Sequence, residues 1–136
     1  MVPQNITYIG ELRCNAIHGP SSVQLITDAP TDNQGKGESF SPTDLVVTAL
    51  ATCIITTAGI AAQRDQVLLD GTKISAEKHM STDAPRRIAK IVLRLDIARG
   101  VPHQFREKLQ AIANTCPVKK SLHPDIMVST EFHYQD

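Results

Sequence analysis

The sequence predicts an α+β fold in the order β-β-α-β-β-α-β, organised around one long apolar helix. Three observations carry this prediction. Residues 42–63 open with a helix-start signature and run without a charge from Leu45 to Gln63. Alternating apolar and polar residues before and after this segment indicate strands, and a helical apolar period begins at Pro102. With 136 residues, the chain is long enough for a single domain, residues 1–136.

The N-terminal part predicts two strands and a loop. The strands are expected at Ile6–Cys14 and Ser22–Thr27, joined by a turn at His18-Gly19-Pro20. Residues 28–40 are rich in turn formers and lead into the helix. Their Gly35-Lys36-Gly37 resembles a fragment of a phosphate loop, but the rest of that motif is missing, which favours an ordinary loop.

The long helix is expected from Pro42 to Gln63, about 33 Å at about 1.5 Å per residue. Ser41 can cap it, Pro42 suits the first helical position, and Asp44 can bond back in a capping-box-like arrangement. A helix that is apolar on all faces must be surrounded by protein or by lipid. Its length would suit a bilayer, but its threonines and the lack of a flanking basic cluster favour a buried helix, with a second subunit covering part of it.

The second half of the chain predicts a hairpin, a helix and a final strand. Thr72–Met80 and Arg86–Ala98 form the hairpin, and the second strand shows the clearest alternation. From Pro102 an apolar helical stripe follows, which Pro117 either ends or continues as a short helix. Ile126–Tyr134 is the last strand. The stripe consists of Phe105, Leu109, Ile112, Ala113 and Cys116.

The composition narrows the function classes. Fourteen basic and fourteen acidic residues cancel, and aromatic residues are only 4% with no Trp, so neither nucleic acid nor an anionic membrane is an expected partner. No secretory signal is visible, which favours the cytoplasm. Three cysteines are too few and odd in number for a disulfide framework. The five scattered histidines form no zinc spacing, so neither a metal nor a cofactor is expected.

Two cysteines are candidates for chemistry. Cys116 directly precedes Pro117, so it can cap a short helix near Lys119 and Lys120, which would lower its pKa. It can equally complete the apolar stripe of its own helix. Cys53 has no charged residue within one helical turn, and burial alone favours an inert thiol that serves packing. A reactive Cys53 therefore requires a cation from elsewhere in the fold.

The combination of SPTDLVVTALATC with a later CPV resembles the OsmC/Ohr family of osmotically inducible and organic hydroperoxide resistance proteins. YIGELRCNA, LITDAP, the strand order and the last strand fit the same family, so the resemblance covers nearly the whole chain. It implies an intertwined homodimer with two central helices, and for many members a thiol peroxidase that reduces organic hydroperoxides. The Thr43-Asp44-Leu45 pattern resembles a less characterised OsmC-like branch that carries Thr-Glu there.

The resemblance implies a role for each matching residue. Cys53 corresponds to the peroxidatic cysteine, whose thiolate attacks the peroxide and becomes a sulfenic acid. Cys116 corresponds to the resolving cysteine, which forms a disulfide that a dithiol or another thiol reduces. Arg13 matches the arginine that stabilises the thiolate, although a solvated strand charge is its plainer interpretation. Cys14 should face the opposite way and serve packing.

The sequence departs from the family pattern at the carboxylate that would hold Arg13. Peroxidase members typically carry Glu ten residues before the first cysteine, where this chain has Thr43. Asp44 lies nine residues before Cys53, about 900° around the helix and roughly 13 Å along it, on the opposite face. Asp44 is therefore either the site carboxylate or a helix cap, and Glu38 in the preceding loop is a possible substitute.

Three functions are consistent with these residues. The first is a cytosolic thiol peroxidase acting through Cys53, Cys116 and Arg13. The second is a non-enzymatic protein that binds a small apolar ligand at the dimer interface. The third is a peroxide-sensing switch that passes its oxidation to another protein through a mixed disulfide.

Overall fold

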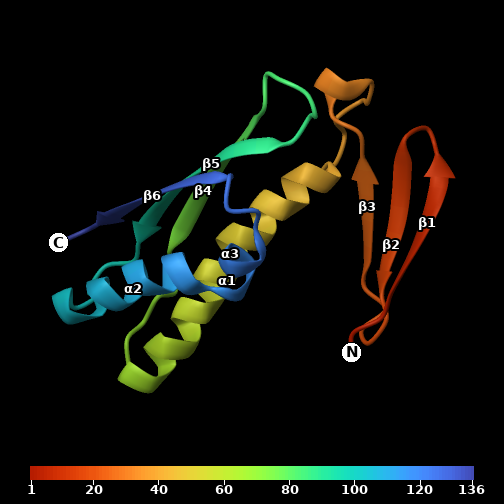
Figure 1. Cartoon of the computed structure of the whole chain (residues 1–136). Helices are drawn as coiled ribbons and strands as arrows, with labels where there is room; N and C mark the ends of the chain where they lie inside the picture. Colours follow the sequence, from red (N-terminus) through yellow and green to blue (C-terminus); the bar gives the residue numbers. More distant parts are fainter. The chain divides into compact units, whose positions relative to one another are not determined.

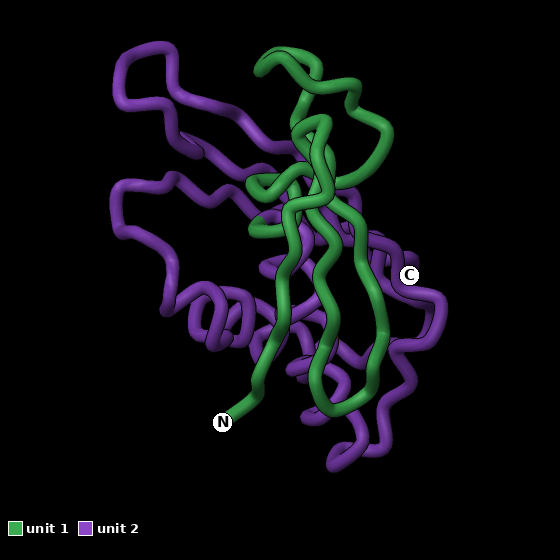
Figure 2. Tube along the Cα trace, turned by 90° about the vertical axis from the view of Figure 1, so that its right-hand side faces the viewer, with its two compact units in different colours: residues 1–46 green, residues 47–136 purple.

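The computed structural model describes residues 1–136, and the chain forms two compact units, residues 1–46 and 47–136 (Figure 2). The mixture of helices and two separate three-stranded sheets confirms the predicted α+β class. The element order is β-β-β-α-β-β-α-α-β, with one short 3-10 turn at Thr31–Asn33. It therefore differs from the prediction by one added strand and one added short helix.

The first unit contains a three-stranded antiparallel sheet in the order β1-β2-β3 (Figure 1). The strands are β1 (Gln4–Gly10), β2 (Arg13–His18) and β3 (Gln24–Asp28). The turn predicted at residues 18–20 lies between β2 and β3, as expected. The central strand β2 bonds to both neighbours, which fixes the register of every side chain on it.

The extra strand arises because the predicted strand Ile6–Cys14 is in fact a hairpin. The chain reverses at Glu11 and Leu12, which have φ angles of 53° and 62°. Two consecutive left-handed residues suit the tight turn of a hairpin, a position that Gly, Asn or Asp usually takes. Glu11 and Leu12 give no such signal, so the prediction of one strand was wrong. As a result, Arg13 begins a strand instead of ending one.

The long helix α1 (Pro42–Asp65) confirms the prediction, extending two residues beyond it. Its start is the predicted capping box: the Asp44 N–H donates to Ser41 Oγ at 3.1 Å, and the Ser41 N–H donates to Asp44 Oδ2 at 2.9 Å. Both residues thus satisfy backbone donors that the first helical turn leaves without partners.

Ser41→Ala is expected to lower the free energy of unfolding by about 0.5–2 kcal/mol, because the cap hydroxyl is lost at a buried position. Urea unfolding measures this loss. Thr56→Ala is the matched control, since it removes an exposed hydroxyl from the middle of the same helix. Equal stability of Ser41→Ala and the wild type would contradict the capping role.

The second unit contains a sheet in the order β4-β5-β6, with β4 antiparallel and β6 parallel to the central strand. The strands are β4 (Lys73–Met80), β5 (Ile88–Ile97) and β6 (Met127–Tyr134). The parallel connection from β5 to β6 runs through α2 (His103–Thr115) and the short α3 (Pro117–Ser121). In Figure 1, α1 and α2 lie on the same side of this sheet.

Most buried residues of this unit are those that the strand and helix periods of the sequence predict. The inward side chains of β5 have no exposed surface, and the predicted stripe of α2 is buried at Phe105, Leu109 and Ala113. Leu50, Ile54 and Ala58 of α1 are equally buried. The inward residues of β5 are Ile91, Leu93, Leu95 and Ile97.

The helix α1 is long and apolar enough to cross a membrane, judged by length and composition alone. The central helix of a soluble protein passes the same test, and 33% of its most apolar stretch is buried inside the structure. Other side chains of the helix are exposed, with 56% of Ile60 accessible to solvent.

Candidate functional site

The structure brings the side chains of Cys53 and Cys116 together in the second unit. Cys53 is half-buried on α1, Cys116 is buried between α2 and α3, and the Cys53 side chain is near enough to raise the pKa of Cys116. Both cysteines are free. Two neighbouring thiols form a disulfide when one is oxidised and the other attacks it, so this pair is a candidate for dithiol chemistry.

Cys116 is held at the junction of two helices. Its N–H donates to the carbonyl oxygen of Ile112 at 2.8 Å and closes α2, while its carbonyl oxygen accepts the Lys120 N–H at 3.0 Å and opens α3. The extended backbone of Cys116 separates the helices, and Pro117 supplies the first residue of α3 without a donor to satisfy. The backbone from which the sulfur projects is therefore held on both sides of Cys116.

The pKa of Cys116 is raised, which corrects the expectation of a lowered value. Burial is the largest cause, and the contact with Cys53 acts in the same direction. The backbone N–H groups of Lys119 and Val118 face the sulfur and lower the pKa, but they make no cap hydrogen bond of ordinary geometry. The buried environment outweighs the short helix, so Cys116 stays a neutral thiol.

This shift predicts a loss of stability at alkaline pH. The thiol of an unfolded cysteine ionises at about pH 8.5, whereas the folded Cys116 ionises at a higher pH. The neutral Cys116 thiol therefore contributes its full stability at neutral pH, and this contribution is lost as the pH rises through the folded-state pKa. Urea unfolding with a phosphine reductant measures the free energy of unfolding at each pH. Between neutral pH and about pH 9.5 this free energy should fall less for Cys116→Ala than for the wild type. Equal losses would contradict the raised pKa.

Arg13 lies in the first unit between two carboxylates. Its guanidinium forms ion pairs with Asp28 Oδ2 at 3.3 Å and with Glu38 Oε2, and 26% of the side chain is exposed. The hydrogen bond to Glu38 is the main cause of the raised pKa of Arg13, while burial opposes it. The interpretation of Arg13 as a solvated strand charge is therefore wrong, because both carboxylates hold it in place.

Asp28 is the site residue that the sequence did not reveal. It is 1% exposed, and its Oδ2 accepts both Arg13 and the Glu38 N–H, the latter at 3.0 Å. That backbone hydrogen bond is the largest cause of its lowered pKa, with burial acting against it and Arg13 reinforcing it. Arg13 and Asp28 are directly opposite each other on β2 and β3. Correct strand pairing would have exposed this opposite-charge pair, but the missed hairpin placed Arg13 in the wrong strand.

The remaining predicted residues have clear positions. Glu38, the alternative to Asp44, is the loop carboxylate that binds Arg13, whereas Asp44 caps α1. Cys14 lies on β2 opposite Tyr8 and Thr27 and is half-buried. The carboxylates that hold the arginine are therefore Glu38 and Asp28.

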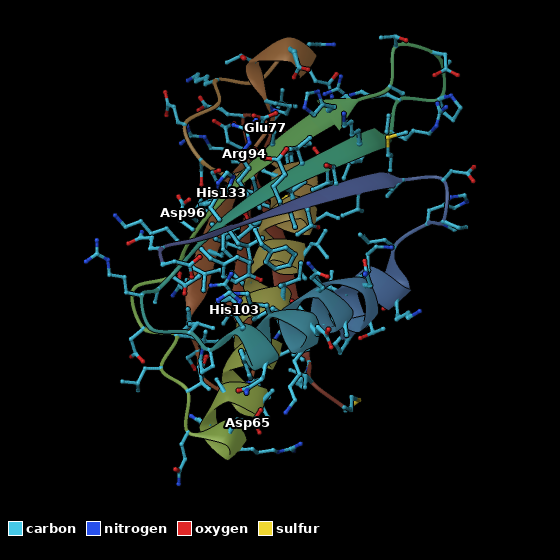
Figure 3. The ribbon with its side chains drawn as sticks, turned by 90° about the vertical axis from the view of Figure 1, so that its left-hand side faces the viewer. Asp65, Glu77, Arg94, Asp96, His103 and His133 are labelled. Carbon is cyan, nitrogen blue, oxygen red and sulfur yellow. The ribbon has the colours of Figure 1, made fainter.

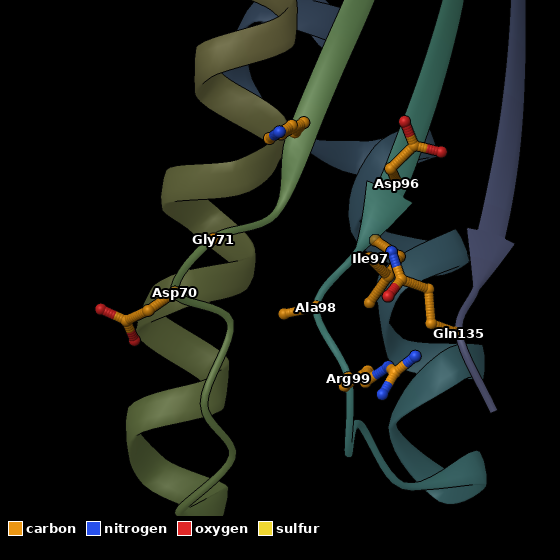
Figure 4. Close-up of a pocket in the computed structure, with 8 residues that line it drawn as sticks. Asp70, Gly71, Asp96, Ile97, Ala98, Arg99 and Gln135 are labelled. Carbon is orange, nitrogen blue, oxygen red and sulfur yellow. The ribbon is translucent and has the colours of Figure 1, made fainter.

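The outer face of the second sheet carries a separate charged surface. Figure 3 shows Glu77, Arg94, Asp96 and His133 along its strands, and Arg94 forms an ion pair with Glu131 at 3.2 Å. At one end of this sheet lies a pocket of about 400 Å³ (Figure 4). Its lining includes both acidic and basic residues but no cysteine, so it is distinct from the thiol pair. No group of three or more His, Cys, Asp or Glu residues is placed to hold a metal ion.

The fold and the thiol pair define an α+β protein with a dithiol site next to its longest helix. The family model of OsmC-like proteins matches residues 35–131. The chain therefore belongs to the OsmC/Ohr family that its sequence resembles. Proteins of this family are soluble, which favours a helix of a soluble protein over a membrane span for α1.

Solved structures extend the comparison over almost the whole chain. A protein of Psychrobacter arcticus 273-4, provisionally described as an osmotic stress induced and detoxification response protein, is 42% identical, with a TM-score of 0.92 and coverage of 98% of this chain and 96% of that chain. An OsmC-like protein of Mycoplasma pneumoniae is 15% identical, with a TM-score of 0.82 and coverage of 100% and 98%.

A third structure carries a functional description. The organic hydroperoxide resistance protein OsmC of Legionella pneumophila is 16% identical, with a TM-score of 0.75 and coverage of 97% of this chain and 96% of that chain. At this identity the likeness concerns the fold. No curated protein matches the chain.

Proposed function

We propose that this protein is a thiol-dependent peroxidase that reduces organic hydroperoxides. The observation that carries the proposal is the proximity of the Cys53 side chain to the buried Cys116, whose pKa it helps to raise. Membership of a family that includes organic hydroperoxide resistance proteins supports the same chemistry.

The reaction has three balanced steps. The Cys53 thiolate attacks one peroxide oxygen, the O–O bond breaks as an S–O bond forms, and the alkoxide leaves and takes a proton to become an alcohol. Cys116 then attacks the Cys53 sulfenic acid, so that a disulfide forms and water leaves with the Cys116 proton. A dithiol or two thiols reduce the disulfide and are themselves oxidised.

The two cysteines have environments that suit different roles. A neutral Cys116 does not compete for the peroxide, because the thiolate is the nucleophile. Its raised pKa thus favours the resolving role, with Cys53 as the peroxidatic residue. The apolar residues of α1 around Cys53 favour an organic hydroperoxide over a small polar peroxide.

Arg13 is proposed to stabilise the Cys53 thiolate, the role that its family counterpart implies. Its support is the pair of carboxylates that orient it, the buried Asp28 and the exposed Glu38. A fixed guanidinium lowers the cost of forming a thiolate without having to be reoriented during the reaction. Asp44 is assigned to the helix start, not to this cluster.

The proposed working form is a cytoplasmic, intertwined homodimer in which residues 1–136 act as one OsmC-like domain. Large apolar side chains of the first sheet and of α1 remain exposed in the single chain, which is unusual for a monomeric protein. A dimer interface would remove these apolar side chains from water. They include Ile6, Tyr8, Val23 and Ile60.

The direct test is consumption of cumene hydroperoxide in the presence of dithiothreitol, followed together with the mass of each cysteine peptide. The proposal expects turnover and a Cys53–Cys116 disulfide after peroxide treatment without reductant. If neither a sulfenic acid nor a disulfide forms, the protein is instead a non-enzymatic binder of an apolar ligand. Oxidation of Cys53 without turnover, together with a trapped mixed disulfide, would identify a peroxide-sensing switch.

A further inference from the structure

The hydroxyl of Thr57 lies next to the sulfur of Cys53. Thr57 is one helical turn after Cys53 on α1, and its Oγ1 is 4.0 Å from Cys53 Sγ, within the range of hydrogen bonds to sulfur. Residues four apart on a helix share a face, so this contact follows directly from their spacing. Thr57 is half-buried, in the same unit as both cysteines.

Neighbouring threonines of the same helix behave differently. The hydroxyls of Thr52 and Thr56 each donate at 2.8 Å to the backbone carbonyl oxygen four residues earlier. Such back-bonding is the ordinary state of a threonine in a helix. Thr57 instead has its hydroxyl at the cysteine sulfur, although the carbonyl oxygen of Cys53 is equally four residues earlier.

We propose that Thr57 is a further catalytic residue of the dithiol site, which donates a hydrogen bond to the Cys53 thiolate and then to the oxygen of the sulfenic acid. The inference rests on the proposed peroxidase for its second part only. Hydrogen bonds to an ionised acceptor are stronger than those to a neutral one, so the donor favours the thiolate over the thiol. Thr57 keeps its own proton throughout, and the proton that leaves with water comes from Cys116.

Thr57 and Cys116 would have different tasks at the Cys53 sulfur. Cys116 has a weak S–H donor and must change partner when it attacks the sulfenic acid. Thr57 has an O–H donor on the same rigid helix as Cys53, so it stays in place through the cycle. It can therefore hold the sulfenic oxygen in one orientation while Cys116 attacks the sulfur.

The test uses Thr57→Val, which replaces the hydroxyl by a methyl group of similar size, and Thr57→Ser, which retains it. Thr52→Val is the matched control, because it removes an exposed hydroxyl of the same helix without touching the sulfur. All variants carry Cys116→Ser, so that the reaction of Cys53 is read without disulfide formation. Alkylation by iodoacetamide is followed from acidic to alkaline pH by mass spectrometry of the Cys53 peptide.

Thr57→Val is expected to move the alkylation profile of Cys53 to higher pH by about one unit, which is about a tenfold slower reaction at neutral pH. The limiting rate at high pH should change much less than the rate at neutral pH, since the sulfur is fully ionised in both proteins and its nucleophilicity depends only weakly on its pKa. Thr57→Ser and Thr52→Val should follow the parent profile. A profile of Thr57→Val that matches the parent at every pH, or an equal shift in Thr52→Val, would overturn the inference.

This readout is independent of the proposed peroxidase, because alkylation needs no hydroperoxide. A shifted profile in a protein that cumene hydroperoxide does not oxidise would support the Thr57 hydrogen bond and contradict the peroxidase. If the peroxidase holds, Thr57→Val should also form the sulfenic acid more slowly at neutral pH, and Thr57→Ser should restore the rate. Unchanged urea midpoints ensure that the comparison concerns the site and not the fold.

Discussion

Cys53→Ser is expected to reduce thiol-dependent consumption of cumene hydroperoxide to the background rate, while Cys116→Ser still consumes one equivalent of peroxide per protein. Serine lacks a nucleophile that ionises near neutral pH, so the first step stops in Cys53→Ser. In Cys116→Ser without added thiol the first step proceeds once, and the sulfenic acid accumulates because it has no neighbouring thiol. A burst of peroxide loss, quantified with a sulfenic-acid probe on the Cys53 peptide, distinguishes the two variants.

Cys14→Ser serves as the control, because Cys14 lies on β2 in the first unit and has no assigned step. It should keep full turnover. The assignment would be reversed if Cys116→Ser lost the burst and Cys53→Ser kept it. Full turnover by Cys53→Ser would remove the whole mechanism.

Arg13→Met is expected to slow the oxidation of Cys53 by about 100-fold or more, the usual effect of removing one fixed group that stabilises charge at a reaction centre. Methionine keeps much of the aliphatic stem and removes the positive charge. The rate of sulfenic acid formation at several peroxide concentrations measures the effect. Glu38→Gln keeps a hydrogen-bond acceptor for the arginine and should have a smaller effect than Arg13→Met.

Loss of stability complicates Arg13→Met alone, because it leaves the buried Asp28 carboxylate without its counter-charge. The double variant Arg13→Met/Asp28→Asn resolves this difficulty. The asparagine amide at position 28 is neutral and still offers an oxygen to the Glu38 N–H. Folding should therefore recover, while the slow oxidation of Cys53 remains. Recovery of the oxidation rate together with folding would mean that Arg13 only supports the structure.

Local signals were sufficient to predict most of the fold. The capping residues around Pro42, the uncharged run of α1 and the strict alternation of β5 each depend on neighbours within one or two turns of the same element. The helix junction at Cys116 was predictable for the same reason, since a proline in the first position of a helix is a local signal. These elements appear in the structure with shifts of a few residues at their ends.

The features that sequence reasoning missed depend on contacts between distant parts of the chain. The turn at Glu11 and Leu12 contains none of the usual turn residues, so only the pairing of β1 with β2 reveals it. Asp28 looked like an ordinary loop residue until β3 placed it opposite Arg13. The raised pKa of Cys116 reflects burial by the surrounding fold, which opposes the effect of the local helix.

The two bonds of Asp28 have a consequence for how this protein can diverge. One carboxylate oxygen holds both the guanidinium of Arg13 and the peptide N–H of residue 38, so the loop is attached to the sheet at that residue whatever side chain it carries. An insertion or deletion within residues 29–37 would present a different side chain to the arginine while the buried counter-charge stayed in place. Relatives could therefore vary the second carboxylate by changing the length of a loop, without altering any strand.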